Sequence, residues 1–298
     1  MSGPNVQTQC PAKVNLFLEV TGRRPDGYHT LATLFAKIAL FDVLDFEPAR
    51  EFSLEIVDEA GQGLAAGEDN LVLRAARAFR SAFRTGAGAR IRLTKRIPMG
   101  AGLGGGSSDA AGTLLGLARL YRMERKTGLM PKLRTLALGL GADVPVFLHP
   151  SPFTEGRGVG ERLRPIKVGR TLPYMLLVYP GVNVPTKDVF GRLTRPSRPD
   201  VLTALSQLNK LNKKLEKGAP ISEWGPLVFN RLEAGVLSGH PEVAQAKTIL
   251  LRLGLQGVLM SGSGSSVYGF VGSQSEGEQV LRRLRAYPWK SYLTCFLG

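Results

Sequence analysis

Alternating apolar and polar side chains predict several strands along this chain. Residues 11–20 carry Val or Leu at positions 14, 16, 18 and 20, and Lys13, Asn15 and Phe17 lie between them. This two-residue period predicts a half-buried strand whose second face presents these three side chains. Further strands are expected at residues 34–46, 52–57, 89–97, 174–179, 257–260 and 267–270.

Helical periodicity separates these strands. Asn70 is a suitable N-cap residue at the start of the first predicted helix. Alternating strands are typical of antiparallel sheets with one covered face, so we expect an α+β fold rather than a doubly wound parallel sheet. The flexible stretch Gly156–Gly160 suggests a boundary between two domains, 1–155 and 156–298. Helices are expected at residues 70–83, 108–121, 131–140, 200–216 and 241–253.

Charge adds a preference for anionic partners. The 298 residues include 39 Lys and Arg against 24 Asp and Glu, a formal net charge of +15. Such an excess favours nucleic acid, a membrane surface or a phosphorylated metabolite, and it also fits a general basic bias without function. No run of five basic residues occurs, so a nucleic-acid-binding arm is not indicated.

Cysteine usage and the chain ends indicate a reducing compartment. Cys10 and Cys295 do not form a disulfide framework in a chain of this length. Residues Met1–Gln9 lack the basic and apolar regions of a signal peptide, and the strongest apolar run, 172–179, is too short to span a bilayer. We therefore expect a cytoplasmic protein without a membrane segment.

A glycine-rich segment between a predicted strand and a predicted helix carries the strongest chemical signal. Five glycines occupy residues 100–106, and Ser107, Ser108 and Asp109 follow as suitable N-cap residues. Glycine permits positive φ and a close approach of the backbone to a ligand, and a helix N-terminus attracts anions. The segment therefore predicts a phosphate-binding loop, whose serine hydroxyls could also bind Mg²⁺.

Three classes of phosphate loop are poorer matches. A Walker loop requires a Lys after the glycines, and this loop has none. The dinucleotide pattern Gly100-x-Gly102-x-x-Gly105 occurs, but the strand before it is basic and alternating, and no acidic residue ends a second strand about 20 residues on. A protein-kinase loop is not followed by a helix, and the His-Arg-Asp and Asp-Phe-Gly motifs do not occur.

The order of these motifs resembles the GHMP kinase family. Residues 98–108 resemble its Pro-x-Gly-x-Gly-Leu-Gly-Ser-Ser loop, residues 11–16 its first motif and residues 260–266 its third. Gly-Tyr-His at 27–29 and Gly-Ala-Asp-Val-Pro at 141–145 resemble the branch of kinases that act on 4-diphosphocytidyl-2-C-methyl-D-erythritol. The resemblance implies a two-domain α+β fold, with an N-terminal ribosomal-protein-like, ATP-binding α/β domain and a C-terminal ferredoxin-like, substrate-side α+β domain.

The resemblance also implies a reaction and its binding residues. The reaction is the ATP-dependent phosphorylation of the substrate's 2-hydroxyl in the non-mevalonate isoprenoid precursor pathway. Because the sequence has no acidic cluster suited to a metal ion, we expect Mg²⁺ to be held by ATP oxygens and water, and Ser108 could contribute a further ligand. For ATP, the matching positions are Asn70 and Lys95, implied to contact adenine, and Pro98, Gly100, Gly102, Leu103, Gly104, Gly105, Gly106, Ser107 and Ser108 of the loop. For the substrate, they are Asn15, Pro185, Thr186, Gly262, Ser263 and Gly264, together with Tyr28, His29 and Phe190, which are implied to bind the cytosine base.

Two residues are candidates for catalysis. Asp143 is the one carboxylate in the apolar run 138–148, and the resemblance implies that it is the general base. The alternative is a helix N-cap before Val144 and Pro145. Lys13 would keep that carboxylate ionised or stabilise charge on the transferred phosphoryl group. The alternative is an ordinary surface lysine on a strand.

Several alternatives remain at this point. Tyr28 is also compatible with an ordinary turn, and residues 261–266 with a plain hairpin loop. The chain could be another small-molecule kinase of the family, acting on a sugar, homoserine or an isoprenoid precursor. It could also be a basic RNA-binding module. We expect a small-molecule substrate with a cytidine diphosphate group, no nucleic-acid or membrane partner, and a monomer or weak homodimer.

Overall fold

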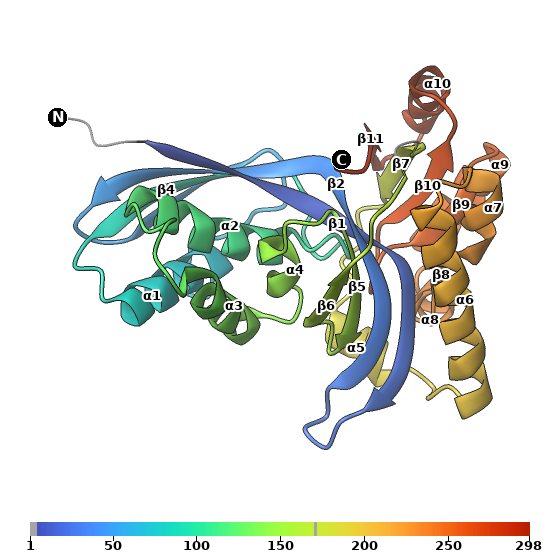
Figure 1. Cartoon of the computed structure of the whole chain (residues 1–298). Helices are drawn as coiled ribbons and strands as arrows, with labels where there is room; N and C mark the ends of the chain where they lie inside the picture. Colours follow the sequence, from blue (N-terminus) through green and yellow to red (C-terminus); the bar gives the residue numbers. More distant parts are fainter. Residues whose placement is uncertain (1–4, 170–171) are drawn as a thin grey trace. The chain divides into compact units, whose positions relative to one another are not determined.

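The computed structural model describes residues 5–169 and 172–298, which form two compact units (Figure 1). Unit 1 comprises the described residues up to Ala12 together with Leu40–Met99 and Gly104–Pro150. Unit 2 comprises Lys13–Ala39, Gly100–Leu103 and the described residues from Ser151 to the C-terminus. The units are therefore not the consecutive halves 1–155 and 156–298, because the chain contributes two early segments to unit 2. The first four residues of the predicted N-terminal segment Met1–Gln9 lie outside the described residues.

Unit 1 is a small sheet packed with four helices. Strand β3 (Ser53–Asp58) pairs in parallel with β4 (Gly88–Lys95), and β4 pairs antiparallel with residues 43–49 of β2 (His29–Ala49). As predicted, β4 alternates buried and exposed positions. The helices are α1 (Leu71–Phe83), α2 (Gly105–Leu120), α3 (Leu129–Leu140) and α4 (Val144–Leu148), which pack against one another.

Helix α2 lies at the centre of unit 1 and is buried along most of its length. Two glycines permit its close packing. A Cβ atom on Gly112 would lie 2.3 Å from Cys10 Sγ, and one on Gly116 would lie 2.3 Å from the Phe46 ring. A larger side chain at either position would push the helix away from strands β1 (Val6–Arg23) and β2.

Unit 2 is built on an antiparallel sheet of order β11-β7-β10-β9, against which helices α9 and α10 pack. The four strands are β11 (Lys290–Thr294), β7 (Tyr174–Tyr179), β10 (Val267–Val271) and β9 (Gln256–Met260). Strands β5 (Phe153–Gly158), β6 (Arg162–Pro165) and β8 (Phe229–Asn230) belong to the sheet of β1 and β2. The helices are α5 (Thr186–Gly191), α6 (Arg198–Glu216), α7 (Ile221–Trp224), a 3₁₀ turn (Gly225–Leu227), α8 (Glu233–Gly239), α9 (Pro241–Arg252) and α10 (Gln274–Leu284).

The prediction of a half-buried strand at residues 11–20 was wrong, because residues 12–20 of β1 are buried on both faces. Leu18 and Val20 belong to the hydrophobic core of unit 2. On the other face the ring of Phe17 packs on Phe229, with the ring centroids 5.5 Å apart. Lys13 and Asn15 therefore point into the protein, and each requires hydrogen-bond partners.

The mixture of helices and antiparallel strands confirms the α+β expectation. The predicted helices and strands are all present, with ends shifted by a few residues. Over the two described ranges, no helix combines the length and apolar character needed to cross a bilayer.

The packing of α2 can be tested with a pair of glycine substitutions. We expect Gly116→Ala to destabilise the protein by about 1–3 kcal/mol, because its methyl group overlaps the buried Phe46 ring. A methyl group added to Gly139, near the end of α3, would meet no neighbouring atom within 4 Å, so Gly139→Ala should stabilise by about 0.5–1 kcal/mol. Urea unfolding of both variants measures the two changes, and equal midpoints would contradict the packing assigned to α2.

Candidate active site

The side chain of Lys13 lies inside unit 2 and is only 4% exposed. Its Nζ donates to Asn15 Oδ1 at 2.8 Å and to the carbonyl oxygen of Gly102 at 3.1 Å. The Lys13 amide N–H donates to the carbonyl oxygen of Leu103 at 2.9 Å. The alternative of a surface lysine is therefore wrong, and the ammonium lies beside the first part of the glycine-rich loop.

Asn15 is fixed in orientation by its neighbours. Its Nδ2 donates to Thr33 Oγ1 at 2.8 Å, and that hydroxyl donates in turn to the carbonyl oxygen of Phe17 at 2.6 Å. The Asn15 carbonyl oxygen accepts from the buried Tyr268 hydroxyl at 2.9 Å. These bonds point Asn15 Oδ1 toward Lys13, as the predicted shared face of the strand requires.

The glycine-containing loop Ser261–Ser266 packs directly against residues 100–103 of the glycine-rich loop. Ser261 Oγ donates to the carbonyl oxygen of Gly102 at 3.0 Å, and the Ser266 N–H donates to that of Ala101 at 3.1 Å. A Cβ atom on Gly102, where φ is +74°, would lie 2.0 Å from the Ser261 carbonyl oxygen. The loop at 261–266 is therefore more than a plain hairpin turn, because it forms a paired glycine surface beside Lys13.

The predicted nucleobase residues lie at one end of unit 2. The His29 ring stacks on Phe190 with centroids 5.1 Å apart and an interplanar angle of 26°, whereas Tyr28 is 64% exposed. Partial burial, together with the nearby Arg23, lowers the pKa of His29, which favours the neutral imidazole. Phe190 and His29 are thus brought together, with Tyr28 beside them in the turn.

The predicted substrate residues Pro185 and Thr186 lie at the start of α5, where Thr186 contacts the loop Ser261–Ser266. Pro185 is the N-cap residue of α5, and the Thr186 hydroxyl lies 2.8 Å from the Ser263 hydroxyl. Since Phe190 belongs to the same short helix, α5 connects the His29 stack with the 261–266 loop.

The second part of the glycine-rich loop lies in unit 1 and begins α2. The predicted N-cap residues at 107–109 were wrong: Gly104 is the N-cap, in a left-handed conformation with φ of +70°, and the helix starts at Gly105. Ser107 therefore lies in the first turn, where backbone N–H groups have no partner within the helix, whereas the Ser108 N–H already donates to the carbonyl oxygen of Gly104 at 2.9 Å. Among the described residues, the buried Ser108 Oγ has no hydrogen-bond partner.

A buried ionic cluster lies beneath this helix start. Lys95 Nζ is 2.5 Å from Asp42 Oδ2 and 2.7 Å from Asp109 Oδ2, and the three side chains are almost fully buried. Asp42 Oδ1 also accepts the backbone N–H groups of Arg96 and Ile97, which lead into the glycine-rich loop. The cluster therefore joins the end of β4 to Asp109, just after the first turn of α2.

Burial and charge oppose each other in this cluster. Burial by itself lowers the pKa of Lys95, but Asp109 and Asp42 outweigh it and the pKa rises. Burial raises the pKa of Asp109 to about 7, against the pull of the Lys95 ammonium. Since the Lys95 side chain is 1% exposed and engaged with two carboxylates, it gives no support to the predicted adenine contact.

Asn70 and Asp143 both occupy helix N-cap positions, with different use of their side chains. Asn70 Oδ1 accepts the Val72 N–H at 2.9 Å and so caps α1, as expected. Asp143 precedes α4, but within the described structure its carboxylate does not cap that helix. The N-cap alternative for Asp143 therefore does not explain the side chain, and the adenine contact of Asn70 stays a prediction.

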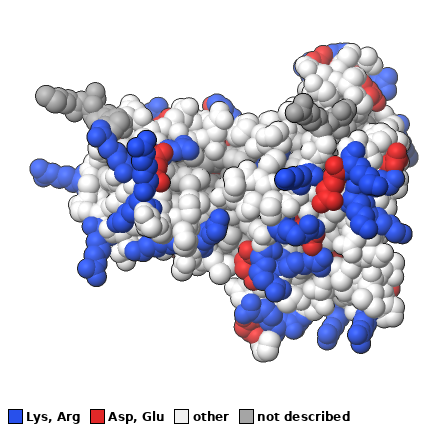
Figure 2. Space-filling view, in the orientation of Figure 1, with Lys and Arg blue, Asp and Glu red and all other residues white. Residues whose placement is uncertain are grey.

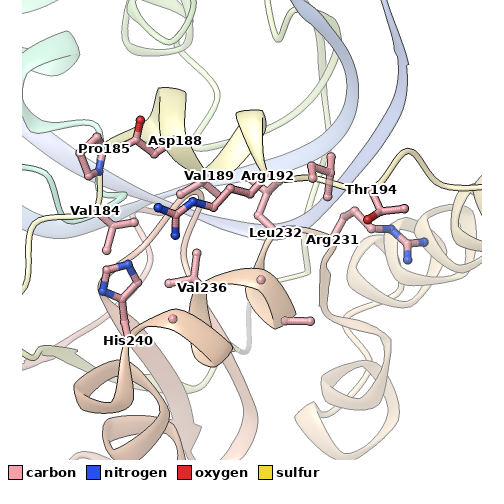
Figure 3. A pocket seen from close by; sticks show the side chains of 14 residues that line it. Val184, Pro185, Asp188, Val189, Arg192, Thr194, Arg231, Leu232, Val236 and His240 are labelled. Carbon is pink, nitrogen blue, oxygen red and sulfur yellow. The ribbon is translucent and has the colours of Figure 1, made fainter.

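A hollow of about 550 Å³ lies beside α5 in unit 2 (Figure 3). Pro185, Asp188 and Arg192 line one side, and Val236 and His240 line another. Pro185 is the one predicted substrate residue among the lining residues. Val189 of α5 also lines the hollow, and this side chain packs against the hydrophobic core of unit 2.

Comparison with known proteins identifies the family. The family model described as "GHMP kinases N terminal domain" matches residues 70–150, and "GHMP kinases C terminal" matches residues 204–288. The chain belongs to the GHMP kinase family. This GHMP kinase is therefore an ATP-dependent small-molecule kinase.

Relatives match nearly the whole chain. A protein of Symbiobacterium thermophilum named 4-diphosphocytidyl-2-C-methyl-D-erythritol kinase is 39% identical over 94% of this chain and 95% of its own. One of the same name from Chlorobaculum tepidum is 38% identical over 92% of each chain. A crystal structure of 4-(cytidine 5'-diphospho)-2C-methyl-D-erythritol kinase has a TM-score of 0.76 and 38% identity, covering 98% of this chain and 99% of that one.

A more distant structure shares the fold alone. Homoserine kinase from Cytophaga hutchinsonii has a TM-score of 0.77 at 19% identity, covering 98% of this chain and 94% of that one. The two-domain α+β GHMP kinase fold is thus confirmed for this chain.

Several polar residues of the site were missed by sequence reasoning. Asp42 and Thr33 lie in β2, each between two apolar residues. This pattern could have indicated that both side chains are buried. Asp109 was noted only as a cap residue. Asn230 and Glu19 carried no motif, and their partners lie far away in the sequence.

Removing a partner from the buried cluster should be costly. We expect Asp42→Ala to lower the free energy of unfolding by about 3–5 kcal/mol, because Lys95 would lose a buried counter-charge and two N–H groups would lose their acceptor. Chemical denaturation measures the loss.

The matched control is Glu55→Ala, which breaks an exposed ion pair with Arg92 in the same unit. Solvent screens that pair, so its removal should leave the unfolding midpoint nearly unchanged. Equal midpoint shifts for the two variants would contradict the importance of the buried cluster.

Proposed function

We propose that this kinase transfers the γ-phosphoryl group of ATP to the 2-hydroxyl of 4-diphosphocytidyl-2-C-methyl-D-erythritol, in the non-mevalonate route to isoprenoid precursors. The observation that carries the proposal is the full-length similarity to several kinases named for this substrate. The geometry at His29 and Phe190 supports the same substrate, because it suits a flat nucleobase.

Cytosine recognition is assigned to residues of unit 2. An aromatic ring such as Phe190 or Tyr28 offers a face for stacking, worth roughly 1–3 kcal/mol per base in single-strand binders. A neutral His29 has one donor and one acceptor nitrogen for the polar edge of the base. Since His29 and Phe190 are stacked on each other, cytosine would bind against this pair rather than into a preformed slot.

Phosphoryl transfer is assigned to Asp143 and Lys13. The 2-hydroxyl oxygen attacks the γ-phosphorus, a new O–P bond forms, the bond to the β–γ bridging oxygen breaks, and ADP leaves. The Asp143 carboxylate accepts the hydroxyl proton. The Lys13 ammonium stabilises negative charge on the attacking oxygen and the transferred group.

ATP binding is assigned to the glycine-rich loop. Within the loop Pro98–Ser108, the backbone N–H groups of its glycines and the N-terminus of α2 are proposed to bind the phosphates. Asn70 is proposed to contact the adenine base, and Lys95 to support the loop from below through its ion pairs. Gly262, Ser263 and Gly264 are proposed to contact the substrate's phosphate groups.

The residues present also fit a magnesium ion bound with ATP. Ser108 Oγ is buried without a partner among the described residues, so it can supply an oxygen ligand. The described residues contain no cluster of three carboxylate, His or Cys side chains suited to a metal ion, so Ser108 and ATP oxygens would hold it. Mg²⁺ bound there would neutralise phosphate charge.

Two alternative functions receive less support. Another substrate of the GHMP kinase family would not explain why relatives near 35–40% identity share one substrate name. For RNA binding, a gathered basic surface would be expected. Figure 2 shows Lys and Arg at many separate places on the face displayed, with Asp and Glu among them.

The reaction and its base are tested together by ³¹P NMR. Purified protein incubated with Mg²⁺-ATP and 4-diphosphocytidyl-2-C-methyl-D-erythritol should give a new phosphomonoester resonance alongside ADP. Asp143→Asn should lower turnover by at least about 10²–10⁴-fold while ATP still binds, because the base is lost. Asp200→Asn, which alters an exposed cap of α6, is the carboxylate control and should keep full turnover. Normal turnover in Asp143→Asn would refute the assignment of the base.

Nucleobase recognition is tested at His29. We expect His29→Ala to raise KM for the cytidine substrate roughly tenfold, as for the loss of one hydrogen bond, and to reduce discrimination against the uridine analogue. The control is His240→Ala, since His240 lines the hollow behind α5. If His29→Ala leaves both KM and selectivity unchanged, the base-recognition role is wrong.

We also propose a cytoplasmic location and a monomer or weak homodimer. Sedimentation velocity over a concentration series would test the second point, because a stable dimer would sediment as one species at every concentration.

A further inference from the structure

The segment Asn230–Glu233 connects β8 to α8 in unit 2 and has no assigned role so far. Its four side chains are Asn, Arg, Leu and Glu, and we call these residues the 230–233 clamp. The clamp contacts two elements that are distant in sequence: strand β1, which carries Lys13 and Asn15, and the loop Ser261–Ser266.

Asn230 determines how the loop begins. Its Nδ2 donates to the carbonyl oxygens of Met260 at 2.8 Å and Gly262 at 2.7 Å, and its Oδ1 accepts the Leu232 N–H at 3.0 Å. The residue is 5% exposed. Both amide protons and the carbonyl of one buried side chain are thus used, and two of these three bonds hold the loop.

Glu233 holds the same position from the other end of the clamp. Its Oε1 accepts the Met260 N–H at 2.9 Å, and its Oε2 pairs with Lys247. Met260 is therefore fixed at both its N–H and its carbonyl group, immediately before Ser261. The loop cannot shift along its strand without breaking bonds to Asn230 and Glu233.

Arg231 holds the clamp to β1. Its guanidinium donates to Glu19 in a two-pronged pair, Nε to Oε1 at 2.9 Å and Nη2 to Oε2 at 2.7 Å. Glu19 is fully buried, and the Arg231 N–H donates to the carbonyl oxygen of Leu18 at 2.8 Å. A two-pronged Arg–carboxylate pair fixes direction as well as distance, so β1 and the clamp are held in one register.

The two held elements meet at Lys13. A Cβ atom on Gly262 would lie 3.2 Å from Asn15 Oδ1 and 3.3 Å from Lys13 Nζ. A displacement of the loop by even about 1 Å would therefore change the surroundings of the Lys13 ammonium, and displacements of that size can cost about 10²-fold in rate.

We propose that the 230–233 clamp is a positioning element, with Asn230 at its centre, that sets the loop Ser261–Ser266 against Lys13 for phosphoryl transfer. The role in transfer rests on the function proposed above. Buried polar side chains are costly unless all their bonds are made, and a fully bonded group specifies one geometry where an apolar core would tolerate several. The clamp therefore holds the loop Ser261–Ser266 in one geometry next to Lys13.

The test compares two buried asparagines. Asn230→Asp keeps the shape of the side chain but turns two N–H donors into an oxygen that faces the carbonyls of Met260 and Gly262. Asn212→Asp is the matched control: Asn212 is also buried in unit 2, and its Nδ2 donates to Glu155, away from the loop. In the kinase assay at a temperature below both unfolding midpoints, we expect kcat to fall roughly 10–100-fold for Asn230→Asp, with KM for ATP within about twofold.

The control separates positioning from general destabilisation. Asn212→Asp should lower the thermal midpoint without a comparable fall in kcat. Equal kcat losses in the two variants, or an unchanged kcat in a folded Asn230→Asp, would overturn the proposal. If Asn230→Asp does not fold, Arg231→Lys is used instead, because it keeps the charge but loses the two-pronged pair with Glu19, and the same kcat criterion applies.

Hydrogen exchange measured by mass spectrometry makes the outcome independent of the substrate. In Asn230→Asp, peptides covering 261–266 and 13–18 should exchange faster than in the wild type, whereas Asn212→Asp should leave both unchanged. If the wild type does not phosphorylate the cytidine substrate, the proposed function fails, and the exchange pattern alone then decides whether the clamp holds the loop. Unchanged exchange in both peptides of Asn230→Asp would refute the clamp.

Discussion

The buried ammonium group of Lys13 is the constraint on which the surrounding part of unit 2 depends. A charged group removed from water requires hydrogen-bond acceptors in fixed places, and here Asn15 and the carbonyl of Gly102 are two of them. Each acceptor then requires its own support. Thr33 and Tyr268 hold Asn15, and Ser261 binds the same Gly102 carbonyl. The glycines follow from this arrangement, because at Gly102 a side chain would occupy the space of the Ser261 carbonyl.

In unit 1, a buried ionic cluster supports the other part of the glycine-rich loop. Helix α2 begins at a glycine-rich loop. Glycine restricts the backbone dihedral angles least, so other contacts must hold the loop in one conformation. Lys95, Asp42 and Asp109 form a compact ionic cluster below this point, and Asp42 also binds the backbone that leads into the loop. Buried charges next to the glycine-rich loop thus supply the rigidity that glycine does not. The loop itself remains free to expose its N–H groups to a ligand.

Periodicity is a local property, so the pattern of the sequence predicted the fold class and most of the longer helices and strands, but not β5, β6, β8, β11, α4, α5, α7, α8 or α10. The motifs carried the resemblance to the family. Residues that depend on distant partners escaped it. A surface position remained the alternative for Lys13, because alternation alone cannot tell that both faces of β1 are covered. Lys95 was assigned to adenine by its position in the chain, although Asp42, 53 residues earlier, binds its ammonium. No sequence pattern indicated Asn230, because the carbonyl groups to which it donates are 30 and 32 residues away.

The division of the chain into units has a consequence for synthesis on the ribosome. Every residue of unit 1 precedes Ser151, so this unit has its complete sequence when half of the chain has been made. Unit 2 combines Lys13–Ala39 with strands near the C-terminus, including β11 at residues 290–294. The strand that carries Lys13 therefore emerges among the first residues and can pair at once with β2, but β8 and most of the apolar side chains that cover Leu18 and Val20 are translated much later. During this interval an apolar strand is without its native cover, which is the condition under which nascent chains depend on chaperones.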